Sequence, residues 1–124
     1  MNSHGRITKK WEGNIFIINS EGPFNDEGVI EVIDEIKKSV ISKRVSNWLR
    51  IEIWDDNTLG SPSVMKRAED YNIWCSENGC QATAIVVSNS VQRHIIERTF
   101  LGNIKIFNSR NKAISWLNKS SIYK

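Results

Sequence analysis

The chain opens with two short segments whose apolar positions are spaced as in β-strands. Residues 6–11, RITKKW, alternate apolar and polar side chains, as a half-buried strand does. Residues 14–20, NIFIINS, are rich in isoleucine, which also favours a strand. Because the turn-forming residues Glu12, Gly13 and Asn14 separate the two segments, the sequence predicts an antiparallel hairpin.

Helical spacing follows the hairpin. Asn25 or Asp26 can cap the start of a helix, because either side chain can accept a hydrogen bond from a free backbone N–H. Acidic residues lie early in this segment and basic residues late, which matches the helix dipole. The apolar residues that recur at helical intervals are Val29, Ile33, Ile36 and Val40.

The rest of the chain alternates between strand-like and helix-like segments. Residues 48–54, WLRIEIW, alternate strictly, and residues 103–107, NIKIF, predict a fifth strand. Residues 82–88, ATAIVVS, form a continuous apolar run, as a strand buried on both faces does. Helical spacing and capping residues predict three further helices. The first covers about residues 62–78, the second is capped by residues 88–90 and runs to Phe100, and the third starts at Ser109.

The predicted element order is therefore β-β-α-β-α-β-α-β-α, an α/β (α+β) fold. Strands joined through helices pair in parallel by right-handed crossovers, so we expect a single-layer, mixed, five-stranded sheet with four helices. All connections are short, and residues 1–124 are predicted to form a single domain.

Composition narrows the class of protein. Of the 124 residues, 40% are hydrophobic and 25% charged, which are globular values and argue against disorder. The net charge of +3 comes from interspersed charges of both signs, so we expect no nucleic-acid partner. The N-terminus lacks a signal-peptide core, and no apolar run is long enough to cross a bilayer. We therefore expect a cytoplasmic protein that does not insert into membranes.

The element order resembles that of the STAS and SpoIIAA-like families, which include anti-sigma-factor antagonists, C-terminal domains of sulfate transporters and small stand-alone bacterial proteins. The resemblance covers about residues 5–119. It is carried by GPFNDEGVIEVIDEI after the hairpin, WLRIEIWDD in the third strand and KAISWLNK near the C-terminus. It implies a SpoIIAA-like fold and a regulatory role.

The turn after the third strand, DDNTLGSPSV, is the region that this resemblance singles out. In the antagonists, a serine in an Asp-Ser-Ser-Gly motif at the start of the following helix is phosphorylated. Here Ser61 and Ser63 lie nearest that place, but Pro62 separates them and Val64 stands where a glycine is expected. The plain interpretation is that Ser61 caps the helix and Pro62 occupies its first position. The alternative is a phosphate or modification site, since helix N-termini attract anions.

Two further groups are candidate sites. Asp55 and Asp56 form an acidic loop that could act as an acid–base pair or bind a cation, although solvated loop residues are the simpler interpretation. Four aromatic residues are candidates for an exposed interaction surface on the sheet, because the resemblance implies helices mainly on one side; otherwise they form a second core. These are Trp48, Trp54, Phe16 and Phe107.

Catalytic and metal-binding patterns are absent from the sequence. No GxSxG, phosphate-binding glycine loop or HExxH motif occurs. His4 and His94 are too scattered for a metal site, and Cys75 and Cys80 lack a CxxC spacing, so we expect reduced, metal-free thiols. We expect no cofactor and no enzymatic activity.

The leading hypothesis is a non-enzymatic regulatory or protein-interaction module. It would dock a protein partner, or a second copy of the chain as a homodimer, through apolar surface near the second helix or the open sheet face. The alternative is a carrier of an apolar small molecule or lipid. A pocket lined by apolar groups with one or two converging polar groups would favour this alternative.

Overall fold

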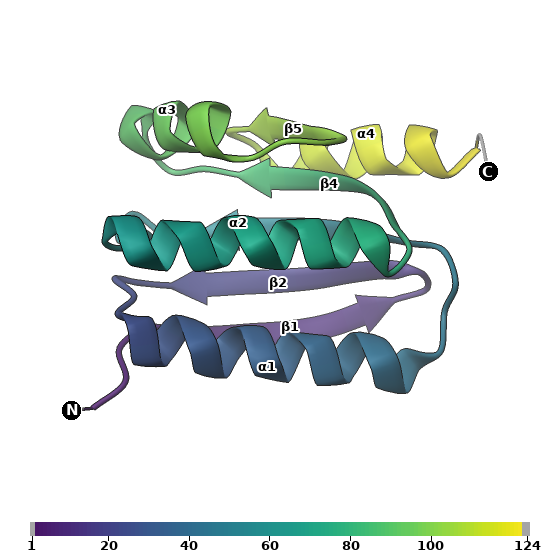
Figure 1. The fold of residues 1–124 in the computed structure, drawn as a ribbon. Coiled ribbons are helices and arrows are strands. Elements are labelled where there is room, and N and C mark those ends of the chain that lie inside the picture. The colour runs from purple at the N-terminus through teal and green to yellow at the C-terminus, as the bar shows by residue number, and fades with distance from the viewer. Residues whose placement is uncertain (1, 123–124) are drawn as a thin grey trace.

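The computed structural model describes residues 2–122 and has the predicted order of elements (Figure 1). The strands and helices are β1 (Arg6–Glu12), β2 (Ile15–Glu21), α1 (Asp26–Lys43), β3 (Trp48–Trp54), α2 (Pro62–Glu77), β4 (Cys80–Val86), α3 (Ser90–Thr99), β5 (Ile104–Phe107) and α4 (Arg110–Ile122).

One five-stranded sheet organises the fold, with its strands in the order β1-β2-β3-β4-β5. β1 and β2 form the predicted antiparallel hairpin, in which Trp11 lies opposite Phe16. The other three pairs of neighbouring strands, β2 with β3, β3 with β4 and β4 with β5, are parallel. The prediction of a mixed sheet with four helices is confirmed.

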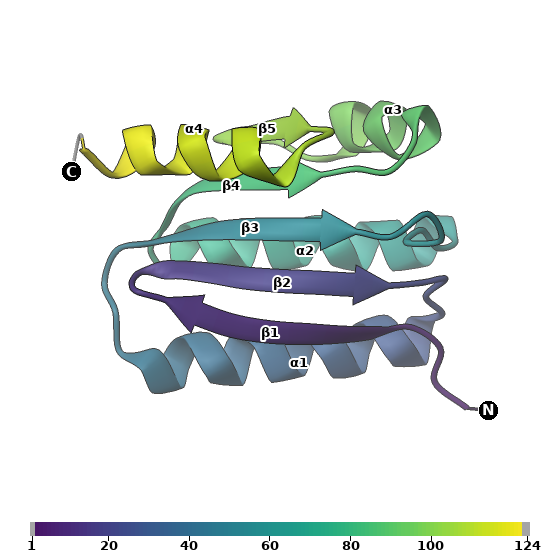
Figure 2. The ribbon, with the colours of Figure 1, turned by 180° about the vertical axis from the view of Figure 1, so that it is seen from behind.

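Helices cover both faces of this sheet. α1 and α2 lie side by side across the front face in Figure 1, and Figure 2 shows α4 on the opposite face. α3 packs at the β4–β5 end of the front face, where Ile96 joins a cluster with Trp54 and Ile85. The expectation of helices on mainly one side therefore holds for α1, α2 and α3 but not for α4.

Strand alternation divides the apolar interior into two cores. Ile17 of β2 and Leu49 and Ile51 of β3 face α4, where they pack with Leu117. Their neighbours Phe16, Ile18 and Trp48 face α1 and α2. The central strands are thus buried on both faces, and β4 is buried at every position except Gln81.

The prediction of an exposed aromatic surface is wrong for the sheet face that carries Trp48 and Trp54. Phe16 and Trp48 are fully buried, and Trp54 is 6% exposed. Phe16 and Trp48 belong to the core under α1 and α2, so the alternative of a second core holds for them. This face is the one that α1 and α2 cover, and the charged residues between the tryptophans pair with each other inside the protein.

Phe107 does not join these aromatics, because it lies on the opposite face of the sheet. Its ring centre is 5.9 Å from that of Trp116 in α4. The four candidates therefore form no common surface.

Two glycines at positive φ offer a matched test of how tightly the α2–β4 turn packs against the loop between α1 and β3. Gly79 follows α2 with φ of 100°, and a Cβ there would lie 2.2 Å from the backbone oxygen of Ser46. Gly102 follows α3 with φ of 106° and has no atom within 4 Å of its Cβ position.

We expect Gly102→Ala to cost about 1–2 kcal/mol of unfolding free energy through backbone strain alone. Gly79→Ala should cost clearly more, because it adds a clash with the backbone to the same strain. Urea denaturation of both variants measures the difference. Equal losses would show that the backbone at Ser46 moves away without cost.

Candidate functional site

An ion pair lies buried between the sheet and α2. Strand alternation places Arg50 and Glu52 on the same face of β3, and their side chains are 2% and 11% exposed. Nη1 of Arg50 donates to Oε2 of Glu52 at 2.9 Å. Burial alone would lower the pKa of Arg50, but Cys75, Tyr71 and Glu52 around it raise that pKa well above its usual value, so the guanidinium is charged.

The guanidinium is held from several elements. Its Nε donates to the hydroxyl of Thr83 in β4 at 3.1 Å, and Nη2 donates to the side-chain oxygen of Asn72 in α2. Nη1 also reaches the sulfur of Cys75 at 3.5 Å. Cζ of the Arg50 guanidinium lies 4.8 Å from the ring centre of Tyr71. Arg50 therefore ties α2 to two strands.

The Glu52 carboxylate has its own partners. The hydroxyl of Tyr71 donates to Oε2 at 2.8 Å, and Nε1 of Trp54 donates to Oε1 at 3.4 Å. Burial raises the pKa of Tyr71 well above its usual value, so its hydroxyl keeps the proton that it donates.

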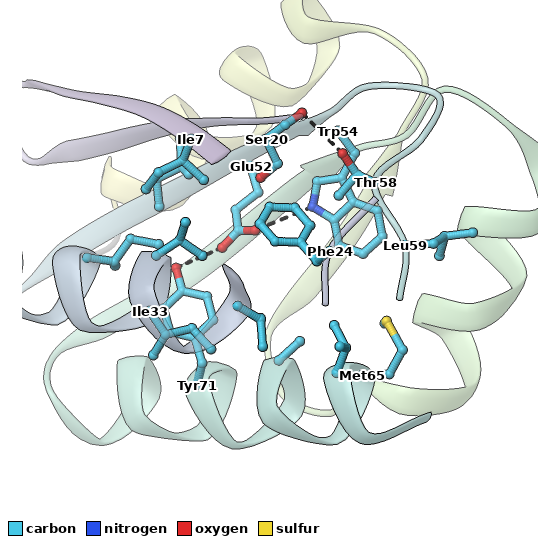
Figure 3. A pocket seen from close by; sticks show the side chains of 16 residues that line it. Ile7, Ser20, Phe24, Ile33, Glu52, Trp54, Thr58, Leu59, Met65 and Tyr71 are labelled. Carbon is cyan, nitrogen blue, oxygen red and sulfur yellow. Dashed lines mark hydrogen bonds between the residues drawn. The ribbon is translucent and has the colours of Figure 1, made fainter. Parts of the chain in front are cut away.

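An apolar pocket begins where this network ends (Figure 3). It is a partly open cavity of about 70 Å³ between the sheet and the helices α1 and α2. Polar atoms reach it from Glu52, Tyr71, Ser20 and Thr58. Most of its wall is apolar and includes Ile18, Phe24, Ile36, Val64 and Met65.

The pocket lies toward the carboxyl ends of the parallel strands. Ser20 comes near the end of β2, Trp54 ends β3, and Thr58 lies in the loop that follows. Ligands of open α/β sheets characteristically bind outside these strand ends. The cavity is about half the size of a 150 Å³ cavity that holds benzene, so it takes only a few methylene groups as it stands.

The turn before α2 has the predicted cap. The hydroxyl of Ser61 accepts from the backbone N–H of Val64 at 3.3 Å, and Pro62 is the first helical residue. Ser63 lies exposed in the first turn and donates to the carboxylate of Asp26 at 2.9 Å. The cap assignment for Ser61 is confirmed. Phosphorylation at either serine stays a hypothesis, and the Asp26 carboxylate would repel a phosphate on Ser63.

The two aspartates before this turn do not converge. Oδ1 of Asp55 accepts from the backbone N–H groups of Gly22 and Asn57 and from the hydroxyl of Thr58. Partial burial would raise the pKa of Asp55, but these hydrogen bonds outweigh it and lower the pKa. Asp56 is exposed. Asp55 thus holds the β3–α2 loop in shape, and only Asp56 fits the simpler interpretation of solvated loop residues.

The remaining titratable candidates lie apart from the pocket wall. Cys75 and Cys80 are both buried and unpaired with each other, and burial raises the pKa of Cys75 to about 12. His94 lies in α3 beside Arg98, and His4 lies before β1. Across residues 2–122, no three His, Cys, Asp or Glu side chains come together as a metal site would require.

Sequence reasoning missed Arg50, Glu52 and Tyr71 as a connected group. The signal was present in WLRIEIW, where two opposite charges share a strand face with two tryptophans. Such a face can be buried if the charges pair, because a paired and hydrogen-bonded charge tolerates removal from water.

Comparison with solved structures identifies the fold. An uncharacterized protein of the DUF3478 family from Shewanella loihica PV-4, described as having a SpoIIAA-like fold, superposes with a TM-score of 0.66. The match covers 94% of this chain and 96% of that one, at 13% sequence identity. The fold is SpoIIAA-like.

Comparisons of the sequence with protein families and with curated proteins find no match. Among residues 2–122, no helix has the length and apolar character that crossing a membrane requires.

The cap generates a prediction for the two serines. Ser61→Ala should cost about 0.5–2 kcal/mol of unfolding free energy, because it removes the acceptor for the Val64 N–H. Ser63→Ala should stay within about 0.5 kcal/mol, since its hydroxyl and its partner Asp26 are exposed. Thermal melts of both variants test this. A loss at Ser63 as large as that at Ser61 would contradict the assignment.

The buried pair generates a second prediction. Glu52→Ala should cost about 3–5 kcal/mol, because it leaves the charged Arg50 buried without its counter-ion. Replacing both residues by leucine should cost less than Glu52→Ala, since no uncompensated charge remains. Urea denaturation of the single and double variants measures both values. A double variant less stable than the single one would show that the pair itself is strongly stabilising.

Proposed function

We propose that this protein binds a small apolar molecule, or the end of an apolar chain, in the pocket between the sheet and α1 and α2. The observation that supports this is an apolar cavity with Glu52 and Tyr71 converging at one side of it. Binding pockets for small molecules combine an apolar wall with a few placed polar groups in this way. The alternative drawn from the sequence thereby gains more support than the leading hypothesis.

A non-enzymatic binding role fits the chemistry of the wall. The Tyr71 hydroxyl and the Trp54 N–H are both engaged with Glu52, and the Thr58 hydroxyl with Asp55 and the backbone oxygen of Ser20. These groups are fixed by one another, which suits recognition of a ligand. Tyr71 and Glu52 are the hydroxyl and carboxylate that meet in the pocket wall, but Glu52 is paired with Arg50 and the raised pKa of Tyr71 keeps its hydroxyl protonated, so this pair does not supply an activated nucleophile.

The size of the cavity limits the ligand. A short chain fits, and a longer one must extend through the open side or part α1 from α2. The wall on the helix side includes the side chains of Val29, Ile33 and Met65. Rotamer changes of such side chains can enlarge the space without unfolding a helix.

A second candidate function is docking of a protein partner, or a second copy of the chain, on the outer surface of α1 and α2. The observation in its favour is the exposure of Ile30, Ile41 and Ile73, at 46%, 66% and 45%. This would give the regulatory or interaction role suggested by the family resemblance, and a ligand in the pocket beneath could influence it.

The binding proposal predicts a specific loss of affinity. Hexan-1-ol should bind the wild-type protein with chemical-shift changes confined to pocket residues, including the Trp54 indole. Ala68 lines the pocket from α2, so Ala68→Leu should fill the cavity and weaken binding at least tenfold.

The matched control is Val91→Leu, which adds bulk at a 58% exposed position of α3 and should leave hexanol affinity unchanged. Two-dimensional NMR titrations give each dissociation constant. Absence of hexanol binding to the wild type, or equal binding by Ala68→Leu, would contradict the proposed function.

A further inference from the structure

We infer that Glu52 selects the ligand by its head group. The pocket accepts an apolar chain that ends in a hydrogen-bond donor without negative charge, such as a hydroxyl or an ammonium group, and rejects a carboxylate on the same chain. This inference rests on the proposed function, because it assigns a ligand class to the same pocket.

The Glu52 carboxylate has spare capacity to accept a hydrogen bond. An ionised carboxylate offers about four lone-pair sites. Among the described residues, Arg50 and Tyr71 donate to Oε2, and only Trp54 donates to Oε1, at the long distance of 3.4 Å. Among the described residues, Oε1 therefore keeps one lone-pair site without a donor, and Glu52 is among the residues that line the cavity.

Three of the four side-chain donors that line the cavity are already engaged, and the fourth, the hydroxyl of Ser20, carries no charge. The hydroxyl proton of Tyr71 and the indole proton of Trp54 point to Glu52. The Thr58 hydroxyl has Asp55 and the backbone oxygen of Ser20 as acceptors. A carboxylate head group needs donors or cations, and these three groups have none to give without breaking an existing bond.

The nearest cation does not reach the ligand. Arg50 is 2% exposed, is not part of the cavity wall, and directs its N–H groups to Glu52, Thr83, Asn72 and Cys75. Glu52 and then Trp54 follow it along the same face of β3, so the carboxylate is the charge that a ligand meets.

Apolar pockets in general reject charged head groups, so an alcohol that binds better than an acid would not by itself implicate Glu52. The informative comparison is between hexylammonium and hexanoate, which carry opposite charges on chains of equal length. A pocket without a fixed charge would discriminate weakly between them. A carboxylate at its base favours the cation and disfavours the anion.

The test is an NMR titration of the wild-type protein at pH 7 with hexan-1-ol, hexylammonium and hexanoate, following the Trp54 indole N–H. We expect hexylammonium to bind at least tenfold more tightly than hexanoate, a difference of about 1.4 kcal/mol. Equal affinities, or tighter binding of hexanoate, would overturn the inference while hexanol binding keeps the proposed function intact. If none of the three binds, the proposed function itself fails.

A variant pair isolates the residue. Glu52→Gln should reduce the preference for hexylammonium over hexanoate at least fivefold. Glu31→Gln removes the same charge at an exposed position of α1 and should leave the preference unchanged. A preference that persists in Glu52→Gln would overturn the inference. If Glu52→Gln does not fold, the wild-type comparison of the two charged ligands still decides the question.

Discussion

The buried pair of Arg50 and Glu52 is the constraint around which the front half of this fold is arranged. Removing two charges from water costs several kcal/mol for each ion, so such a pair persists only where further hydrogen bonds surround it. Here those bonds come from separate elements: Asn72 and Tyr71 from α2 and Thr83 from β4. Satisfying the pair therefore fixes the rotation of α2 about its axis and its distance from the sheet, which apolar packing alone specifies loosely.

The same constraint creates the pocket. Once Tyr71 is turned toward Glu52, the helix face on the N-terminal side of Tyr71 lines the pocket with Val64, Met65 and the small Ala68. Opposite them, β2 contributes the small Ser20 near its end. Space between the layers thus remains at one end of the ion pair, with a carboxylate oxygen beside it. Stability and the proposed binding would depend on one network, so changes in that network would affect both.

Local chemistry explains what the sequence could predict. The hairpin, the helical spacing and the start of α2 at Ser61 and Pro62 each depend on residues that lie within a few positions of one another in the sequence. Each was predicted correctly. Alternation also showed that Trp48, Arg50, Glu52 and Trp54 share a face, but alternation cannot tell which face a helix covers. That face was interpreted as open because the family resemblance implies helices mainly on one side of the sheet. The pocket was beyond prediction, because its wall joins residues of β1, β2, α1, β3 and α2 that lie as far apart in the sequence as Ile7 and Tyr71.

The fold alone assigns no activity, because unrelated functions share folds of this kind. What distinguishes this chain is the chemistry at the carboxyl end of β3. In the antagonists that the sequence resembles, this end carries the serine switch. Here Ser61 is used as a cap, Ser63 faces the Asp26 carboxylate, and Asp55 holds the loop. Those polar groups are engaged in local structure, whereas Oε1 of Glu52, one layer deeper, keeps one lone-pair site without a donor among the described residues. The capped turn also positions Val64 and Met65, which line the pocket. In this chain, the turn before α2 therefore supports one wall of the pocket.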